Sequence, residues 1–357
     1  ESDKNGVRIF SRDYSAETYD KVPYEERNEM RPTKVEKEEW RTEYLTDSSG
    51  YLSKPFKVYL EEGEHTFSLD SVREPLAIKN IRLYAHEEAP SYEEYLKAHS
   101  DKKDATSAPI VIQGEYPTGT SSQTIYQLAD TTSPITQPSH SSRERLNTIG
   151  GDKWQYAGDW ITWTVKIEEA GFYDIIPRSI QNFYSGTYVS RQLLVDGELP
   201  FEEASRLRFN YSTSWLTNKI NTGVKDENGN LVTYKVYLSE GFHDITLKVV
   251  LGDMGELLSM IEDSLATVND YRRKLLMVTG PSPDEYRDYN FDKSMPNVLR
   301  GFKAQAKLLT DISSQLEEII GAKGDHTVIL DKTAWILERM GTQPTKIASL
   351  MDDLKDQ

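Results

Sequence analysis

The stretch that decides the fold class runs from residue 160 to residue 167 and reads WITWTVKI. Ile161, Trp163, Val165 and Ile167 alternate along it with the other four side chains. This two-residue period is typical of a β-strand with one buried face. We therefore predict a strand here, and we expect Trp163 to lie in the core.

Further strands are indicated on both sides of this stretch, from residue 110 to residue 251. Val189, Leu193 and Val195 would share one face of a strand that ends at the turn pair Asp196-Gly197. Residues 231–238 and 243–251 predict a closing antiparallel hairpin. Short strands joined by turns rich in Gly and Asn are typical of a sandwich, so we predict a complete antiparallel β-sandwich over residues 109–253.

An internal repeat extends the β pattern toward the N-terminus. Residues 57–65 read KVYLEEGEH, and residues 235–243 read KVYLSEGFH, an offset of 178. Trp40 and Trp215 match at nearly the same offset, as do residues 47–50 and 226–229. Each copy predicts a strand, a Glu-Gly turn and a second strand, hence an antiparallel hairpin. His65 and His243 take the same place in the two copies, which favours a shared structural role.

The offset places the start of the first copy before residue 1, so we expect the chain to begin inside a domain. Residues 1–88 would be the C-terminal half of a second sandwich. A half sandwich exposes unpaired strand edges, and we expect a missing N-terminal half-domain or a neighbour to cover them. Residues 89–108 read as a linker with a short helix, in which Ser91 is the N-cap and Glu94 completes a capping box.

The pattern changes to helix at residue 254. Apolar residues recur at spacings of three and four over residues 258–268 and 299–319. The second of these helices begins near Pro296 and ends at Gly321, and shorter helices follow over residues 325–340 and from Pro344 onward. We predict a small helical bundle or a helical bridge over residues 254–357. Residues 283–289 would be an ordered loop that joins the sandwich to the bundle.

Composition excludes several classes of function. The chain has 42 Lys and Arg against 58 Asp and Glu, a formal net charge of −16, and no basic stripe, so nucleic acid is not an expected partner. It has no Cys, which excludes disulfides, zinc–thiolate sites and a thiol nucleophile. No apolar run is long enough to span a membrane. Motifs of metalloproteases and serine hydrolases are absent, and we expect no enzyme activity.

The β region resembles carbohydrate-binding modules of families 6 and 35, over about residues 110–252. The resemblance rests on seven stretches in this order: IQGE at 112–115, NTIGG at 147–151, Trp154, GDWITW at 158–163, EAGFY at 169–173, LVDG at 194–197 and EGFH at 240–243. It implies a jelly-roll-like sandwich that binds carbohydrate, and the repeat implies one complete and one partial copy. The predicted fold class is thus mainly β with α, because a small helical bundle follows.

The longer stretch is similar to the N-terminal region of large surface lipoproteins, which are the family 1 solute-binding components of ABC sugar importers. The markers are YRRK at 271–274, TGP at 279–281 and PDEYRDY at 283–289. This similarity implies an extracellular or cell-surface location in a Gram-positive bacterium and a role in sugar transport. It also implies C-terminal receptor lobes of the same protein as partners, which are absent from this sequence.

Trp154, Tyr156 and Trp160 are the first candidates for carbohydrate binding. A sugar ring has an apolar face that stacks favourably on an aromatic plane. Trp160 points away from the face that carries Ile161, so its ring could reach a loop or an outer sheet. The alternative is that all three pack between sheet and loop, because Trp is highly buried on average.

Arg178, Gln181, Asn182 and Arg191 are the second candidate set. Planar donors of this kind bind sugar hydroxyls or a uronate carboxylate. Arg191 shares a strand face with apolar residues, and a buried guanidinium needs a carboxylate or several carbonyls. The alternative is therefore a structural ion pair, for instance with Glu115 or Glu202.

The resemblance also makes calcium a possible cofactor, because such modules often hold calcium near their first and last strands. Glu115 and Asp253 are the candidates, although calcium takes six to eight oxygen ligands and solvated charges are the alternative. The function we predict is non-catalytic carbohydrate binding. The alternative is a structural spacer or protein-docking module without affinity for sugar.

Overall fold

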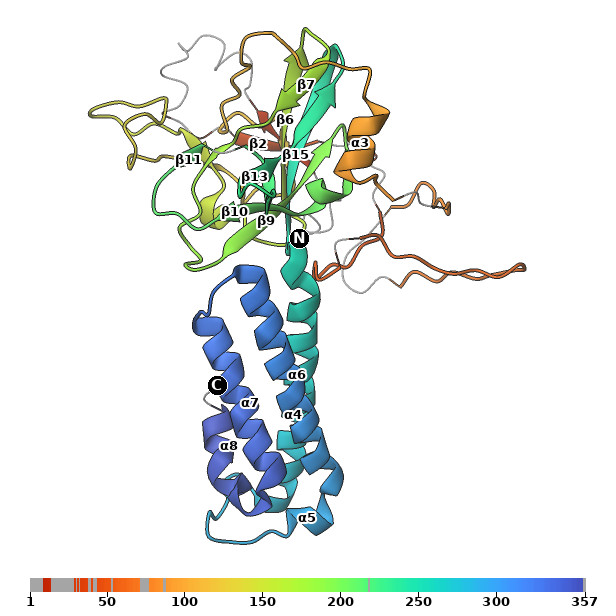
Figure 1. The fold of residues 1–357 in the computed structure, drawn as a ribbon, viewed down its shortest axis with the longest axis vertical. Helices are drawn as coiled ribbons and strands as arrows, with labels where there is room; N and C mark the ends of the chain where they lie inside the picture. The colour runs from red at the N-terminus through yellow and green to blue at the C-terminus, as the bar shows by residue number, and fades with distance from the viewer. Residues whose placement is uncertain are drawn as a thin grey trace. The chain divides into compact units, whose positions relative to one another are not determined.

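The computed structural model describes residues 9–13, 29, 31, 33–37, 40, 44–52, 54–70, 77–85, 88–217 and 219–355. The chain divides into a β unit, residues 1–252, and a helical unit, residues 253–357 (Figure 1). Each unit has its own apolar core. The two are therefore described separately.

The β unit is built around a seven-stranded sheet in which every pairing is antiparallel. The strand order is β10-β9-β15-β6-β3-β1-β2. The strands are β1 (Ile9–Asp13), β2 (Thr33–Lys37), β3 (Gly119–Thr120), β6 (Trp160–Ile167), β9 (Tyr188–Val195), β10 (Leu207–Asn210) and β15 (Gly241–Val250).

Four two-stranded ribbons accompany the sheet. They are β4 (Gln127–Leu128) with β5 (Thr148–Ile149), β7 (Gly171–Asp174) with β14 (Lys235–Leu238), β8 (Arg178–Ser179) with β11 (Leu216–Thr217), and β12 (Asn221–Lys225) with β13 (Leu231–Thr233). Val165, Leu193 and Ile245 from the sheet share one core with Val236 and Leu238 from the β7–β14 ribbon. The antiparallel β class is confirmed, and the jelly-roll winding stays a prediction.

The closing hairpin predicted over residues 231–251 is wrong. β14 pairs with β7, whereas β15 pairs with β6 and β9 in the large sheet. The turn between them carries the chain from one layer to the other, at Gly241 with φ +136°. The physical reason is burial: Val236, Leu238 and Ile245 can all reach the core only if their strands lie on opposite sides of it.

The alternation along β6 is confirmed at three positions, because Ile161, Val165 and Ile167 are buried. Trp163 is half-buried, so its assignment to the core is wrong. Its indole Nε1 donates a hydrogen bond to the Gly114 carbonyl at 2.9 Å. An indole N–H needs an acceptor, and this one lies in a surface loop, so the ring stays at the margin of the core.

The predicted short helix is confirmed as α3 (Tyr92–Ala98), and its capping box between Ser91 and Glu94 is complete. The helix packs on the β unit rather than hanging in a free linker. The Tyr95 hydroxyl is buried and accepts a hydrogen bond from the Tyr237 backbone N–H at 2.8 Å. The Tyr92 hydroxyl does the same for the Lys235 N–H at 3.0 Å. Both contacts satisfy the free edge of β14.

The turns of the two copies of the repeat have similar backbone geometry. Gly63 and Gly241 have φ of +146° and +136°, and Gly50 and Gly229 have φ of +75° and +81°. One ring nitrogen of His65 lies 2.7 Å from the carbonyl oxygen four residues earlier, and the equivalent nitrogen of His243 repeats this contact at 2.9 Å. Local sequence thus sets the turn geometry in both copies.

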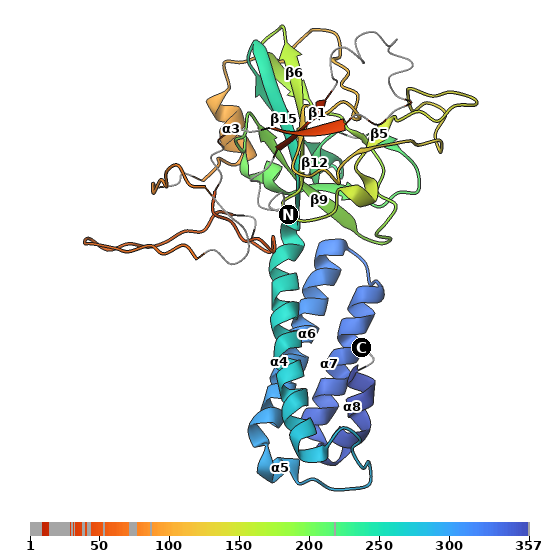
Figure 2. The ribbon, with the colours of Figure 1, turned by 180° about the vertical axis from the view of Figure 1, so that it is seen from behind.

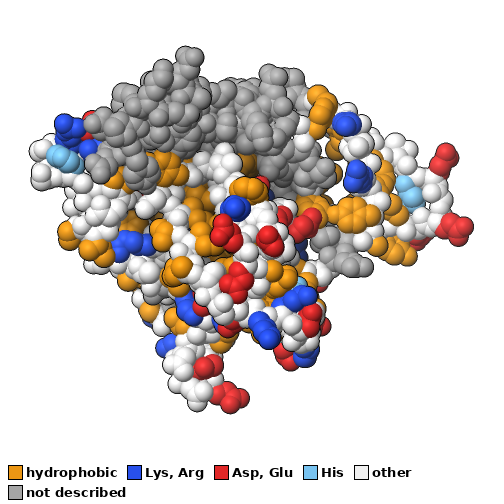
Figure 3. Space-filling model, turned by 90° about the horizontal axis from the view of Figure 1, so that it is seen from above, with side chains coloured by type: hydrophobic (Ala, Val, Ile, Leu, Met, Phe, Trp, Pro, Cys, Tyr) orange, Lys and Arg blue, Asp and Glu red, His pale blue; other side chains and the backbone are white. Residues whose placement is uncertain are grey.

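The first copy does not form the strands that the second copy forms. The described residues between 44 and 85 contain no strand, so the hairpin predicted over residues 57–65 is wrong for the first copy. A strand needs a hydrogen-bonded neighbour, and the second copy finds one in each of two sheets. We name residues 56–70 the arm. It is the extended red-orange segment at the right of Figure 1. Figure 3 shows hydrophobic side chains exposed on the same side.

The helical unit is a bundle of α4 (Gly255–Thr279), α6 (Pro296–Ile320), α7 (Asp325–Thr342) and α8 (Ile347–Lys355), with the short α5 (Phe291–Ser294) at one end (Figure 2). Pro296 begins α6 and Gly321, with φ +81°, ends it, as the sequence predicts. Phe302, Ile312, Leu337 and other buried residues form the core. None of the helices in the described part of the chain has the length and apolar composition that a membrane crossing requires.

Residues 283–289 lie between α4 and α5, inside the helical unit, so the prediction that they join the sandwich to the bundle is wrong. The loop is ordered, as predicted, because the Tyr289 hydroxyl accepts a hydrogen bond from the Asp284 N–H at 2.9 Å. The junction is instead η4 (Gly252–Met254), a single helical turn. The change from β to α therefore takes four residues, 251–254, rather than a linker.

We predict that Tyr95→Phe lowers the free energy of unfolding by about 1–3 kcal/mol, because it leaves the partly buried Tyr237 N–H without its acceptor. Chemical denaturation followed by circular dichroism measures this change. Tyr59→Phe is the control, since Tyr59 is 88% exposed. An equal and negligible effect of both substitutions would contradict the role of Tyr95.

We also predict a pH-dependent contribution from His243. Partial burial disfavours its charged form, but the Asp196 carboxylate at 2.7 Å and the Ser239 carbonyl outweigh burial and raise the pKa of His243 above 6.5. The contribution is complete below the unfolded pKa, about 6.5, and is lost as pH rises through the folded pKa. Urea titrations of wild type and His243→Gln should therefore differ most in acid and converge in base. A difference that is constant with pH would refute this expectation.

Candidate functional site

Trp154, Tyr156 and Trp160 differ in their exposure. Trp160 is buried, with 8% of its surface exposed. Trp154 is half-buried, and its Nε1 donates to the Asp159 carbonyl at 3.3 Å. Only Tyr156, at 52% exposed, presents its ring to solvent. These contacts support the packing alternative for the two tryptophans.

Arg191 explains why the Trp154 ring is occupied. Its guanidinium lies 4.3 Å from the centre of that ring and donates to the carbonyls of Ser190 and Trp154 at 2.9 and 3.1 Å. Burial lowers the pKa of Arg191 to about 10, an effect that the nearby Asp159 carboxylate opposes. Within the described residues, Arg191 forms no ion pair with the two carboxylates that we considered, so carbonyls and the indole take their place.

Gln181 closes a turn rather than facing a ligand. Its Oε1 accepts hydrogen bonds from the Phe183 and Tyr184 N–H groups at 2.9 and 3.0 Å, and its Nε2 donates to the Tyr184 carbonyl. Asn182 is exposed in the same turn. The turn displays two aromatic rings, since Phe183 is 59% and Tyr184 54% exposed.

Arg178 is the predicted residue that lies in a polar and aromatic cluster. Its Nη2 donates to the Ser133 hydroxyl at 2.8 Å and to the Thr136 hydroxyl at 3.3 Å. Its guanidinium carbon lies 5.7 Å from the centre of the Trp215 ring. The Trp215 Nε1 in turn donates to the Asp130 carboxylate at 3.0 Å. We name these five residues the Arg178–Trp215 cluster.

Two local structures hold the cluster together. In the β8–β11 ribbon, Ser179 pairs with Leu216, so Arg178 in β8 lies near Trp215, which directly precedes β11. Asn147 closes the loop that begins at Asp130: its Oδ1 accepts from the Asp130 N–H at 2.8 Å, and its Nδ2 donates to the Asp130 and Pro138 carbonyls. A ribbon and a cross-linked loop thus fix the side chains before any ligand arrives.

The cluster offers a planar cation, an indole, a carboxylate and two hydroxyls. Within the described residues Arg178 has no ion pair, and its buried Nε has no hydrogen-bond partner. The Nη2 of Arg178 is bound by two hydroxyls, so the unused donor is the buried Nε, and a buried donor without an acceptor costs free energy. Ile135, between the two hydroxyl residues, is 69% exposed, so the cluster borders solvent.

Sequence analysis identified Arg178 but missed the other four members of the cluster. Trp215 was noticed only as the repeat partner of Trp40. The available signal was its setting, because residues 210–215 read NYSTSW, an aromatic residue in a loop rich in hydroxyls. The contact with Arg178 depends on strand pairing, which the local sequence does not specify.

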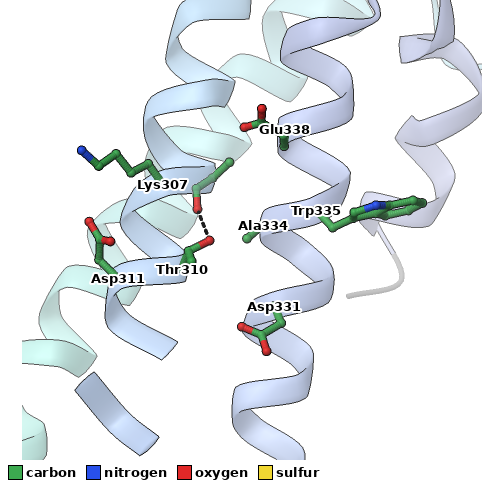
Figure 4. A pocket seen from close by; sticks show the side chains of 8 residues that line it. Lys307, Thr310, Asp311, Asp331, Ala334, Trp335 and Glu338 are labelled. Atoms are coloured by element: carbon green, nitrogen blue, oxygen red, sulfur yellow. Dashed lines mark hydrogen bonds between the residues drawn. The ribbon is translucent and has the colours of Figure 1, made fainter. Parts of the chain in front are cut away.

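Two hollows are alternative candidates for a site. One beside the β8–β11 ribbon measures about 60 Å³ and includes Ser179 and Gln181, room for about two waters at ~30 Å³ each. The other, between α6 and α7, measures about 460 Å³ (Figure 4). In this hollow the Asp331 carboxylate lies 3.7 Å from the Lys323 Nζ, and the Arg339 guanidinium carbon lies 4.7 Å from the centre of the Trp335 ring. These two residues of the hollow are thus already engaged by side chains of the bundle.

The calcium prediction receives no support from side-chain geometry. In the described residues, no three His, Asp or Glu side chains gather where they could hold a metal ion. Glu115 is buried in the β unit, and Asp253 is the first residue of the helical unit. Calcium at these residues stays a prediction.

Comparison with known proteins finds one family match, over part of the chain. Residues 256–356 match the family of the bacterial solute-binding protein, 4-helix bundle domain. The match spans α4 to α8 and lies within the helical unit. No curated protein matches the chain.

Among solved structures, the chain is similar to a Paenibacillus sp. cycloisomaltooligosaccharide glucanotransferase complexed with cycloisomaltoheptaose. The identity is 18%, and the match covers 45% of this chain and 21% of that chain, with a TM-score of 0.28. The chain therefore spans only a small part of that enzyme's length. At this TM-score the likeness supports no inference about fold, ligand or activity.

We predict that Trp160→Ala lowers the free energy of unfolding by about 3–5 kcal/mol, because it opens a cavity at a buried position. Phe183→Ala is the matched control, since that ring is exposed and should cost within about 0.5 kcal/mol. Thermal and chemical denaturation measure both values. A small cost for Trp160→Ala would contradict the packing role and return this residue to the binding candidates.

Proposed function

We propose that the β unit binds carbohydrate without catalysis, and that the Arg178–Trp215 cluster is its binding site. The observation that carries the proposal is the guanidinium of Arg178, which is half-buried, lies beside an indole and has no carboxylate partner among the described residues. A sugar supplies hydroxyls for the free donors and an apolar ring face for the indole.

The remaining members of the cluster fit the same ligand class. Ser133 and Thr136 carry hydroxyls that donate as well as accept, so they can satisfy either end of a sugar hydroxyl. Asp130 anchors the Trp215 Nε1, which fixes the tilt of the ring. The cluster borders solvent at Ile135, which is 69% exposed, and this position suits the side of a polysaccharide chain.

The helical unit indicates in what kind of protein this binding takes place. Its match to the solute-binding protein bundle favours a protein of bacterial solute uptake. The resemblance of the sequence to sugar importers favours a sugar as the solute. In this proposal the chain is an extracellular, surface-exposed region of a lipoprotein of an ABC transporter in a Gram-positive bacterium.

The absence of catalysis is part of the proposal and has a chemical reason. Glycoside hydrolysis needs two carboxyl groups that flank the scissile bond. The Arg178–Trp215 cluster contains one, Asp130, and its oxygens accept hydrogen bonds from Trp215 and Thr132. This arrangement holds a loop and a ring in place, and it suits recognition of a sugar rather than its cleavage.

A glycan array of the full chain, probed with calcium and then with chelator, tests the proposal. We expect selective binding to a related group of glycans, and at least a tenfold weaker affinity for Trp215→Ala and Arg178→Ala. Trp335→Ala and Arg273→Ala are the matched controls, because both residues are exposed and lie in the helical unit. Loss of binding with chelator would support the calcium prediction.

The proposal fails if the array is blank at high protein concentration, or if the two cluster variants bind as wild type does. Melting temperatures of all four variants must be measured in parallel, so that loss of binding is not loss of folding. Trp215 is half-buried, and Trp215→Phe keeps most of its volume if alanine proves too disruptive.

The second candidate function is a spacer or protein-docking module. The burial of Trp160 and the occupied ring of Trp154 favour it, because two of the aromatic residues expected to bind sugar serve packing instead. This alternative predicts no affinity for any glycan. A blank array from a fully folded chain would support it.

A further inference from the structure

The arm, residues 56–70, exposes apolar side chains that its sequence equivalent buries. Val58 is 62%, Leu60 39% and Phe67 49% exposed. At the offset of 178, their equivalents Val236, Leu238 and Ile245 are 1%, 4% and 8% exposed. The two segments share nearly the same sequence up to the turn, so the difference in burial comes from their neighbours.

The second copy shows which neighbours such a segment requires. β14 pairs with β7 through four residues, from Lys235 opposite Asp174 to Leu238 opposite Gly171. β15 then pairs with β6, beginning with Gly241 opposite Ile167. β6 and β7 are consecutive strands joined by three residues, so a single short segment of chain supplies both partners.

The arm is already shaped for such a segment at its turn. Gly63 has nearly the φ of Gly241, and His65 makes the same contact with the carbonyl four residues earlier as His243 does. The turn that sends one strand to each layer is therefore present before either strand has a partner. A preformed turn lowers the conformational entropy that binding must overcome.

We propose that the arm docks a polypeptide segment with the pattern of β6 and β7. This segment would carry an alternating apolar strand, a short polar turn, and then Gly followed by two aromatic residues. Its first strand would pair with residues 63–69 and its second with residues 57–60, by strand addition to exposed backbone edges. The inference is independent of sugar binding, because it involves none of the Arg178–Trp215 cluster.

The test uses a synthetic peptide with the sequence of residues 159–175, which contains both strands. Hydrogen exchange of the full chain is measured with and without this peptide. We expect amides in residues 57–60 and 63–69 to become at least tenfold more protected, with the turn residues unchanged. A peptide in which Ile161, Val165 and Ile167 of the first strand are replaced by Asn should give no protection.

Variants of the arm complete the test. Val58→Asp together with Leu60→Asp should abolish the protection, whereas Glu62→Lys, an exposed change in the turn, should leave it intact. Because a free peptide can fail to bind as a strand pair, the same sequence is also attached to residue 1 through a flexible linker, which raises its effective concentration to about millimolar.

The proposal is overturned if neither the free nor the attached segment protects the arm, or if Val58→Asp with Leu60→Asp is protected as well as wild type. It is also overturned if the arm of the unmodified chain becomes protected as protein concentration rises. In that case the occupant is a second copy of this chain rather than a β6–β7 segment.

Discussion

The β unit depends on one apolar core, shared by the seven-stranded sheet and the β7–β14 ribbon. Val165, Leu193 and Ile245 enter it from one side, and Val236 and Leu238 from the other. This core forces consecutive strands into opposite layers, both from β6 to β7 and from β14 to β15. The β8–β11 ribbon follows directly from that arrangement, because its first strand begins four residues after β7 ends. The position of the Arg178–Trp215 cluster therefore depends on this core.

The repeat separates what local sequence determines from what packing determines. The turns at Gly63 and Gly241 have similar geometry, although one lies in an exposed arm and the other joins two buried strands. Turn geometry depends on a few neighbouring residues and on glycine's access to positive φ. Strand formation depends on a partner that is distant in sequence. The same stretch of residues can therefore form its turn without forming its strands.

This distinction also explains which features could be predicted from sequence. The helices of the second unit, the α3 capping box and the alternation of β6 all follow from periodicity within one segment. The prediction of the closing hairpin was wrong, because the alternation of apolar residues shows that one face of a strand is buried but not which sheet buries it. The assignment of Trp163 to the core was wrong, because its indole N–H donates to an acceptor at the surface. Trp215 was missed as a site residue because its neighbour Arg178 is remote in sequence and close only through strand pairing.

Among the measurements available, NMR of the indole N–H groups tests the binding site most directly. The chain has six Trp residues, and selective ¹⁵N labelling gives one indole signal for each. A titration with oligosaccharides from the glycans that bind on the array should shift the Trp215 signal. The exposed Trp335 in the helical unit should not move. A spectrum in which Trp215 stays still, while Trp154 or no signal at all responds, would contradict the assignment of the site to the Arg178–Trp215 cluster.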